Sequence, residues 1–101
     1  MNAADYDRVA DELMHLARGI ETSKRPGYTI GSEDVLANFK NVAARVGITT
    51  EQVWAVYFLK HIDAITSIMT RPDLPVAEAA PGRFGDAINY LRLGYAILND
   101  K

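Results

Sequence analysis

The sequence predicts an all-α protein folded as a compact four-helix bundle. Four segments repeat apolar residues at three- and four-residue spacing, which is the period of an amphipathic helix. No segment alternates apolar and polar residues over a sustained stretch, so no strand is expected. The connections are about two to twelve residues long, as in helix bundles. With 101 residues the chain is expected to form one domain, residues 1–101.

The first helix is predicted at about residues 3–21, with apolar residues on one side and charged residues on the other. The segment 22–31 contains a proline and two glycines and is therefore predicted to be a loop. Its side chains Lys24, Arg25 and Tyr28 either face solvent or hold a phosphate and stack on a base. The apolar stripe of the helix consists of Tyr6, Val9, Leu13, Leu16 and Ile20.

The second helix is predicted at about residues 33–46. Ser32 precedes two acidic residues, a pattern typical of a helix N-cap, and Gly47 is a plausible stop. Asn38 and Lys40 are expected to face solvent. The buried side is expected to consist of Val35, Leu36, Phe39, Val42 and Val46.

The third helix is predicted at residues 50–70, and Thr49 and Gln52 match the capping-box pattern at its start. Because it is apolar on almost every face, it is expected to lie buried in the middle of the fold. Its apolar residues are Val53, Trp54, Val56, Tyr57, Phe58, Leu59, Ile62, Ile65, Ile68 and Met69.

Three titratable residues, Lys60, His61 and Asp63, interrupt this apolar helix. A buried charge is costly unless it is paired or binds something. Lys60 and Asp63 are three residues apart and could form an ion pair, whereas His61 points roughly 100° away from Lys60. Two interpretations stay open: a structural pair beside a hydrogen-bonded histidine, or one half of a binding site.

The fourth helix is predicted at about residues 82–98 and follows a connection, residues 71–82, that holds three of the four prolines. A short turn is expected at Val76–Ala79. The helix carries two apolar stripes and is expected to be contacted from two sides. One stripe consists of Phe84, Ala87, Ile88, Leu91, Tyr95 and Leu98, and the other of Tyr90, Leu93 and Ile97.

Four polar residues, Arg83, Asp86, Asn89 and Tyr90, line one side of this fourth helix. In the structural interpretation Arg83 contacts Asp86 within the helix, and Asn89 bonds to a neighbouring backbone. In the functional interpretation this side faces the polar residues of the third helix, because bundles build their sites from facing helices.

Such a two-helix pocket would suit a phosphorylated ligand. Asp63 and Asp86 are then the candidate ligands of a divalent cation such as Mg²⁺. Lys60 and Arg83 are the candidate phosphate-binding cations. The nucleotide-binding set is completed by His61, Asn89, Tyr90 and Asn38.

The composition excludes several classes of protein. The chain has no cysteine, so disulfide scaffolds and thiolate zinc sites are ruled out. A net charge of −2 argues against binding DNA or RNA by bulk charge. The longest apolar run, residues 53–59, is far shorter than the ~20 residues that span a bilayer, and the acidic N-terminus is unlike a signal peptide. We therefore expect a cytoplasmic protein with no membrane contact.

The segment from about residue 25 to residue 98 resembles small helical proteins of phages and prophages. These are grouped with nucleotide-modification-associated and MazG-like all-α NTP pyrophosphatase proteins. The resemblance rests on Asn38-Phe39, on Lys60-His61-x-Asp63 and on Arg83-x-x-Asp86-x-x-Asn89-Tyr90. It implies a MazG-like bundle in the cytoplasm of a bacterial host, often dimeric or larger, that acts on or binds a nucleotide.

In MazG-like enzymes, acidic residues on two core helices hold Mg²⁺ against a triphosphate, and water attacks to release pyrophosphate. The resemblance implies that Asp63 and Asp86 are the matching catalytic and metal-binding residues. This chain departs from the family pattern, because the enzymes carry a Glu-x-x-Glu set with a further Glu and Asp.

Three functions follow as hypotheses. The first is a Mg²⁺-dependent nucleotide pyrophosphohydrolase. The second is a non-catalytic module that needs no cofactor and binds a nucleotide or a host protein. In the third, the polar residues only tie helices together in an oligomer. Under all three we expect a homo-oligomer, most simply a dimer, because the second and third helices offer more apolar surface than one small bundle covers.

Overall fold

The computed structural model describes residues 1–71, 73 and 80–100, and these fold into four helices packed together, with no strand among them. The helices are α1 (Ala3–Thr29), α2 (Ala37–Val46), α3 (Thr50–Thr70) and α4 (Ala80–Asn99). The predicted all-helical class with four helices is confirmed. No helix in the described ranges is long and apolar enough to cross a bilayer.

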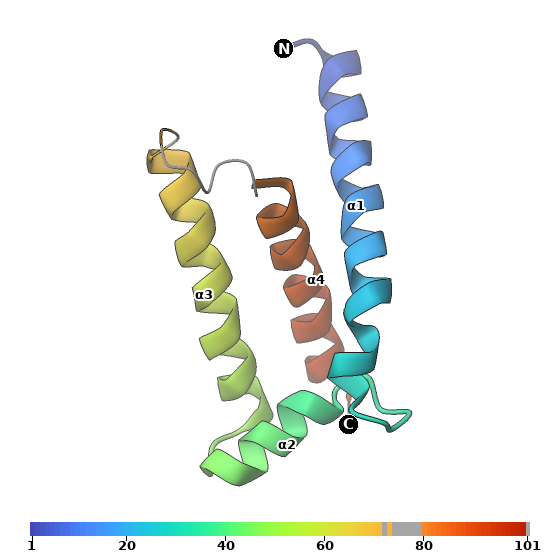
Figure 1. Ribbon diagram of the computed structural model, residues 1–101, viewed down its shortest axis with the longest axis vertical. Coiled ribbons are helices and arrows are strands. Elements are labelled where there is room, and N and C mark those ends of the chain that lie inside the picture. Colours follow the sequence, from blue (N-terminus) through green and yellow to red (C-terminus); the bar gives the residue numbers. More distant parts are fainter. Residues whose placement is uncertain (72, 74–79, 101) are drawn as a thin grey trace.

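The long helices α1 and α3 flank α4, and the short helix α2 crosses one end of all three (Figure 1). The core lies at that end, where the ring of Phe39 on α2 is completely buried. The rings of Tyr28, Tyr57 and Tyr90 surround it at centroid distances of 6.4, 6.2 and 6.0 Å. Phe39 therefore joins all four helices through aromatic contacts.

Helix α1 is longer than predicted: it continues past residue 21, through Pro26, and ends at Thr29. A proline inside a helix removes one backbone hydrogen bond, so the sequence pattern favours a loop. Tertiary contacts outweigh that cost, because Tyr28 is buried and stacks on Phe39. The residue that caps this end, Ile30, has a left-handed φ of 43°, a conformation that a β-branched residue rarely adopts.

Helix α2 is shorter than predicted, since it begins at Ala37 rather than near residue 33. Ser32 does not cap the helix. Its Oγ accepts the N–H of Asp34 at 2.8 Å, and Asp34 Oδ1 accepts the N–H of Leu36 at 2.9 Å. These side-chain turns compete with the first helical turn for the same backbone groups.

Helix α3 spans the predicted residues, and its capping box is formed. Thr49 Oγ1 accepts the N–H of Gln52 at 3.1 Å, and Gln52 Oε1 accepts the N–H of Thr49 at 2.9 Å. The prediction that the helix is buried on all sides is wrong. Only one side is covered, by α2 and α4, and Val56, Leu59 and Met69 are each more than half exposed.

Helix α4 begins at Ala80 and ends at Asn99, slightly outside the predicted range on both sides. Of its two apolar stripes, the one with Leu93 and Ile97 is buried, whereas Leu91, Tyr95 and Leu98 on the other are exposed. The turn expected at Val76–Ala79 lies outside the described residues.

Candidate functional site

The chemically versatile side chains gather where α1, α3 and α4 meet. Lys24 comes from α1, His61 from α3, and Asp86 and Tyr90 from α4, and we call these four residues the polar seam. Lys24 Nζ lies 3.0 Å from Asp86 Oδ1, and the rings of His61 and Tyr90 are 4.5 Å apart between centroids. The seam therefore joins one cation, one carboxylate, one imidazole and one phenol from three helices.

A close approach of α1 to α4 positions the seam. A Cβ added at Gly85 would lie 3.0 Å from Ile20 Cδ1 and 3.5 Å from Ala17 Cα, so glycine allows the two helices to touch. One turn later, Asn89 Nδ2 donates to the backbone oxygen of Ala17 at 2.7 Å. Lys24 follows Ala17 by two helical turns on the same side, which brings its ammonium beside Asp86.

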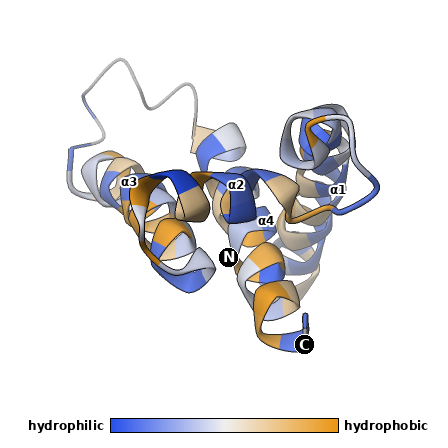
Figure 2. Ribbon diagram, turned by 90° about the horizontal axis from the view of Figure 1, so that it is seen from below, coloured by the Kyte–Doolittle hydropathy of each residue, from blue (hydrophilic) through white to orange (hydrophobic). Residues whose placement is uncertain are grey.

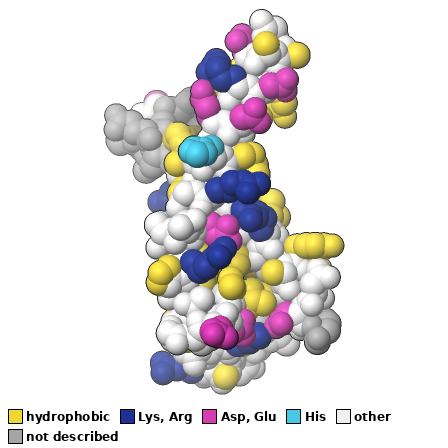
Figure 3. Space-filling model, turned by 90° about the vertical axis from the view of Figure 1, so that its right-hand side faces the viewer, with side chains coloured by type: hydrophobic (Ala, Val, Ile, Leu, Met, Phe, Trp, Pro, Cys, Tyr) yellow, Lys and Arg dark blue, Asp and Glu magenta, His cyan; other side chains and the backbone are white. Residues whose placement is uncertain are grey.

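Ion pairs continue along the contact between α1 and α4. Arg92 on α4 lies 3.2 Å from the carboxylate of Glu21, which also binds Arg25 of its own helix at 3.0 Å. The basic partners are about half exposed, so each pair contributes at most about 1 kcal/mol. Figure 3 shows the basic side chains gathered midway along this side, with acidic ones crowding the end near the N-terminus.

His61 is buried, and its Nδ1 has no hydrogen-bond partner among the described residues. Burial lowers the pKa of His61, and the positive charges of Lys24, Lys60 and Arg83 lower it further, while Asp86 acts in the opposite direction. The imidazole is therefore neutral at pH 7. A neutral imidazole donates through one nitrogen and accepts through the other, so Nδ1 has the capacity for one further hydrogen bond.

The tyrosines of this region stay protonated. Burial raises the pKa of Tyr90 to about 12, with smaller effects from Tyr28, Tyr57 and Asp86. Burial also raises the pKa of Tyr28. The backbone oxygen of Tyr90 accepts the indole N–H of Trp54 at 2.6 Å, which ties this turn of α4 to α3. Because Tyr28 is stacked in the core, its ring is not free to stack on a base.

The structure brings together only some of the predicted site residues. His61, Asp86 and Tyr90 meet in the seam, with Arg83 close enough to influence His61. Asp63 is exposed and lies roughly 200° around α3 from the buried His61. Within the described residues it forms no ion pair with Lys60, which is also exposed.

The remaining predicted residues have other surroundings. Asn89 donates to the backbone oxygen of Ala17, as the structural interpretation expects, and its Oδ1 has no partner among the described residues. The contact of Arg83 with Asp86 is replaced by the pair of Asp86 with Lys24. Asn38 is half-buried on α2. The described part of the chain contains no group of three or more His, Asp or Glu arranged to hold a metal ion, and the Mg²⁺ site at Asp63 and Asp86 stays a prediction.

No family model, curated protein or solved structure compared with the chain matches it significantly. The resemblance to MazG-like phage proteins therefore stays a hypothesis.

The sequence pattern missed that Lys24 is the partner of Asp86, because the segment around Pro26 was predicted to be a loop. A signal was present. Lys24 and Tyr28 follow Ile20 at four-residue spacing, which continues the inward side of α1 for two further turns. An apolar stripe that continues on both sides of a proline favours a helix that runs through it.

Proposed function

We propose that the chain binds a phosphorylated nucleotide at the polar seam. The observation that carries the proposal is the buried His61, whose Nδ1 has no partner among the described residues. The positive charges of Lys24, Lys60 and Arg83 lower its pKa, against the opposite effect of Asp86. Each cation comes from a different helix. This arrangement favours an anion, because a phosphate accepts hydrogen bonds from ammonium, guanidinium and imidazole N–H groups.

Asp86 would compete with a bound phosphate for the ammonium group of Lys24. Its carboxylate already binds Lys24 at 3.0 Å, and a phosphate would compete with it for the ammonium. Nucleotide binding would thus exchange one partner of Lys24 for another. A ligand that also carries a hydroxyl or amino group can donate to the released carboxylate. This favours a nucleotide over inorganic phosphate.

Binding without hydrolysis is better supported than a Mg²⁺-dependent pyrophosphohydrolase. The enzyme hypothesis needs Asp63 and Asp86 around one cation, but Lys24 neutralises Asp86 and Asp63 is exposed on α3. Mg²⁺ also prefers six oxygen ligands in octahedral geometry, of which two carboxylates supply few. We further propose that the protein works as a homo-oligomer. A host protein as partner is the remaining alternative.

The test is a calorimetric titration with nucleoside triphosphates and deoxynucleoside triphosphates, in Mg²⁺ and again in EDTA. We expect binding in both buffers and no release of pyrophosphate. Lys24→Gln and Arg83→Gln are each expected to weaken binding by about tenfold, as for the loss of one charge-assisted hydrogen bond. The control is Arg8→Gln, an exposed arginine on the far half of α1, which leaves the affinity unchanged.

Two results contradict the proposal: no heat of binding with any nucleotide, or equal affinity in the control and in both seam variants. Pyrophosphate release that requires Mg²⁺ and disappears in Asp86→Asn would instead support the enzyme hypothesis.

A further inference from the structure

Helices α3 and α4 each carry an apolar stripe on the side that faces away from α1 and α2. In both helices the stripe residues alternate three and four apart, the spacing of helices that pack side by side at a shallow angle. The two helices are antiparallel neighbours (Figure 1), and hydrophobic residues follow both (Figure 2). The stripes are Ala55, Phe58, Ile62, Ile65 and Met69 on α3, and Ile88, Leu91, Tyr95 and Leu98 on α4.

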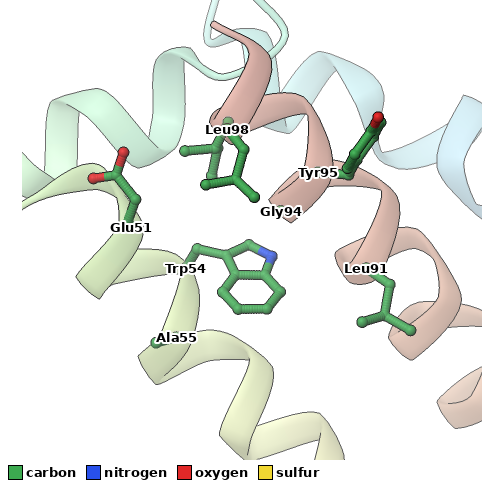
Figure 4. Close-up of a pocket in the computed structure, with 8 residues that line it drawn as sticks. Glu51, Trp54, Ala55, Leu91, Gly94, Tyr95 and Leu98 are labelled. Atoms are coloured by element: carbon green, nitrogen blue, oxygen red, sulfur yellow. The ribbon is translucent and has the colours of Figure 1, made fainter.

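No other part of the described chain covers the middle of this face, which we call the α3/α4 face. Leu91 is 55 % exposed, Tyr95 71 % and Leu98 63 %. Between them and α3 lies an open pocket of about 390 Å³, in which Glu51 is the one charged lining residue. Figure 4 shows Trp54 at the floor of this pocket, with Leu91, Tyr95 and Leu98 around it.

The floor of the pocket is held in place by specific contacts. The indole of Trp54 donates to the backbone of Tyr90 and stacks on Phe58, with ring centroids 4.8 Å apart. It fits there because residue 94 is glycine: an added Cβ would lie 2.6 Å from the indole ring. A shaped, rigid apolar surface loses little conformational entropy when a partner binds to it.

The single chain leaves many large apolar side chains exposed. Among the described residues, 14 large apolar side chains are exposed, against 10 apolar residues in the core. The radius of gyration is 15.4 Å, larger than the roughly 13 Å of a compact domain of 100 residues. Four of the 14 exposed side chains belong to the α3/α4 face, Met69, Leu91, Tyr95 and Leu98, and a second layer of helices would cover them.

We propose that a second copy of this chain covers the α3/α4 face, so that α3 and α4 of each protomer pack on those of the other around a two-fold axis. Four large apolar residues of this face are more than half exposed: Met69, Leu91, Tyr95 and Leu98. At about 200 Å² for a fully exposed large side chain, they present on the order of 500 Å². The half-buried residues between them bring this near the roughly 800 Å² per partner of a standard interface.

A copy of the same chain suits this face better than an unrelated protein. In a two-fold interface the same patch meets itself, so the patch must be self-complementary. Two antiparallel helices with matching stripe spacing meet that requirement, and the near absence of charge avoids like-charge repulsion across the axis. The dimer rests on this face alone and is independent of nucleotide binding.

Sedimentation velocity over a dilution series tests the dimer. The wild-type chain is expected to be a dimer at micromolar concentration and to dissociate on dilution. Tyr95→Glu, which puts a charge on the face without touching the core, is expected to be a folded monomer at the same concentrations. The control is Val56→Glu, which changes an equally exposed residue elsewhere on α3, four residues before Lys60, and keeps the dimer.

The single tryptophan shows whether the dimer uses this face. Trp54 lies in the pocket, so its emission is expected to shift to longer wavelength on dilution, with the midpoint seen by sedimentation. Tyr95→Glu is expected to show the shifted emission at every concentration. A monomeric wild-type chain overturns the proposal. So does a dimer whose Trp54 emission is constant on dilution, or one that Tyr95→Glu leaves intact.

Discussion

The two sides of α4 contain similar apolar residues but differ in what determines their contacts. The inner side is held to α1 by a hydrogen bond from Asn89 to Ala17. Two ion pairs, Asp86 with Lys24 and Arg92 with Glu21, join the same two helices. The outer side, with Leu91 and Tyr95, has no such polar contact in the described residues and is exposed.

The difference shows what determines which of two apolar stripes on a helix becomes buried. Hydrophobic burial is non-directional and would suit either stripe. A buried amide is costly when it loses its partner, so rotating α4 would leave the Asn89 amide without the backbone oxygen of Ala17. The polar residues therefore select the rotation, and the other stripe is left for a second layer.

The largest expected effect separates two leucines on the same helix. Leu93 is 4 % exposed, so Leu93→Ala is expected to lower the free energy of unfolding by about 2–5 kcal/mol. Leu91→Ala, two residues away on the exposed side, is expected to change it by less than about 0.5 kcal/mol in dilute, monomeric protein. Urea unfolding monitored by circular dichroism measures both. Equal losses of unfolding free energy in the two variants would show that both sides of α4 are equally buried.

Two glycines give the next contrast. Gly94→Ala is expected to destabilise by about 1–3 kcal/mol, because its Cβ would overlap a tryptophan ring that a hydrogen bond and stacking hold in place. The control is Gly19→Ala within α1, where no atom lies within 4 Å of the added Cβ. Helix propensity alone then acts, and a gain of about 1 kcal/mol is expected. Thermal unfolding that ranks the two variants the other way would contradict the packing of Trp54 on α4.

The histidine of the seam predicts a pH dependence. The pKa of His61 is lower in the folded chain than its usual 6.5, so the unfolded chain binds the proton more tightly. This contribution to stability is complete above pH 6.5 and is lost as the pH falls from there towards the folded pKa. His61→Gln is expected to lose less stability between pH 7 and pH 5 than the wild type. His15→Gln, at an exposed position of α1, should keep the wild-type slope.

The smallest effect is expected for the ion pair of the seam. Lys24→Gln should change the free energy of unfolding by less than about 1 kcal/mol, because the lysine side chain is half exposed. The same variant is expected to weaken nucleotide binding about tenfold, as one charge-assisted contact would. A large loss of stability with unchanged nucleotide binding would show that the seam stabilises the fold and does not bind the ligand.

Much of the local structure could be read from sequence because it depends on near neighbours. The capping box of α3, its end at Thr70 and the left-handed Gly47 after α2 each depend on residues a few positions apart. The bounds of α1 and the start of α2 could not be read in this way. They depend on the packing of Tyr28 on Phe39, and on side-chain turns that compete with the helix.

In the candidate site, too, the features that depend on near neighbours could be predicted and the contacts between distant residues could not. The spacing of Asp86, Asn89 and Tyr90 placed them on one side of α4, and His61 was expected to point away from Lys60. The partners of Asp86 and Asn89 lie on α1, far away along the chain: 62 residues separate Lys24 from Asp86, and 72 separate Ala17 from Asn89.

The sequence by itself determined that this chain forms four amphipathic helices and that α4 has two apolar stripes, because helical periodicity is a local property. Only the tertiary structure decided which stripe is buried, that α1 runs through Pro26, and that His61 is buried with no partner for its Nδ1 among the described residues. The physical reason is that polar contacts and close backbone approaches depend on where distant helices meet. Hydrophobic spacing carries no information about that.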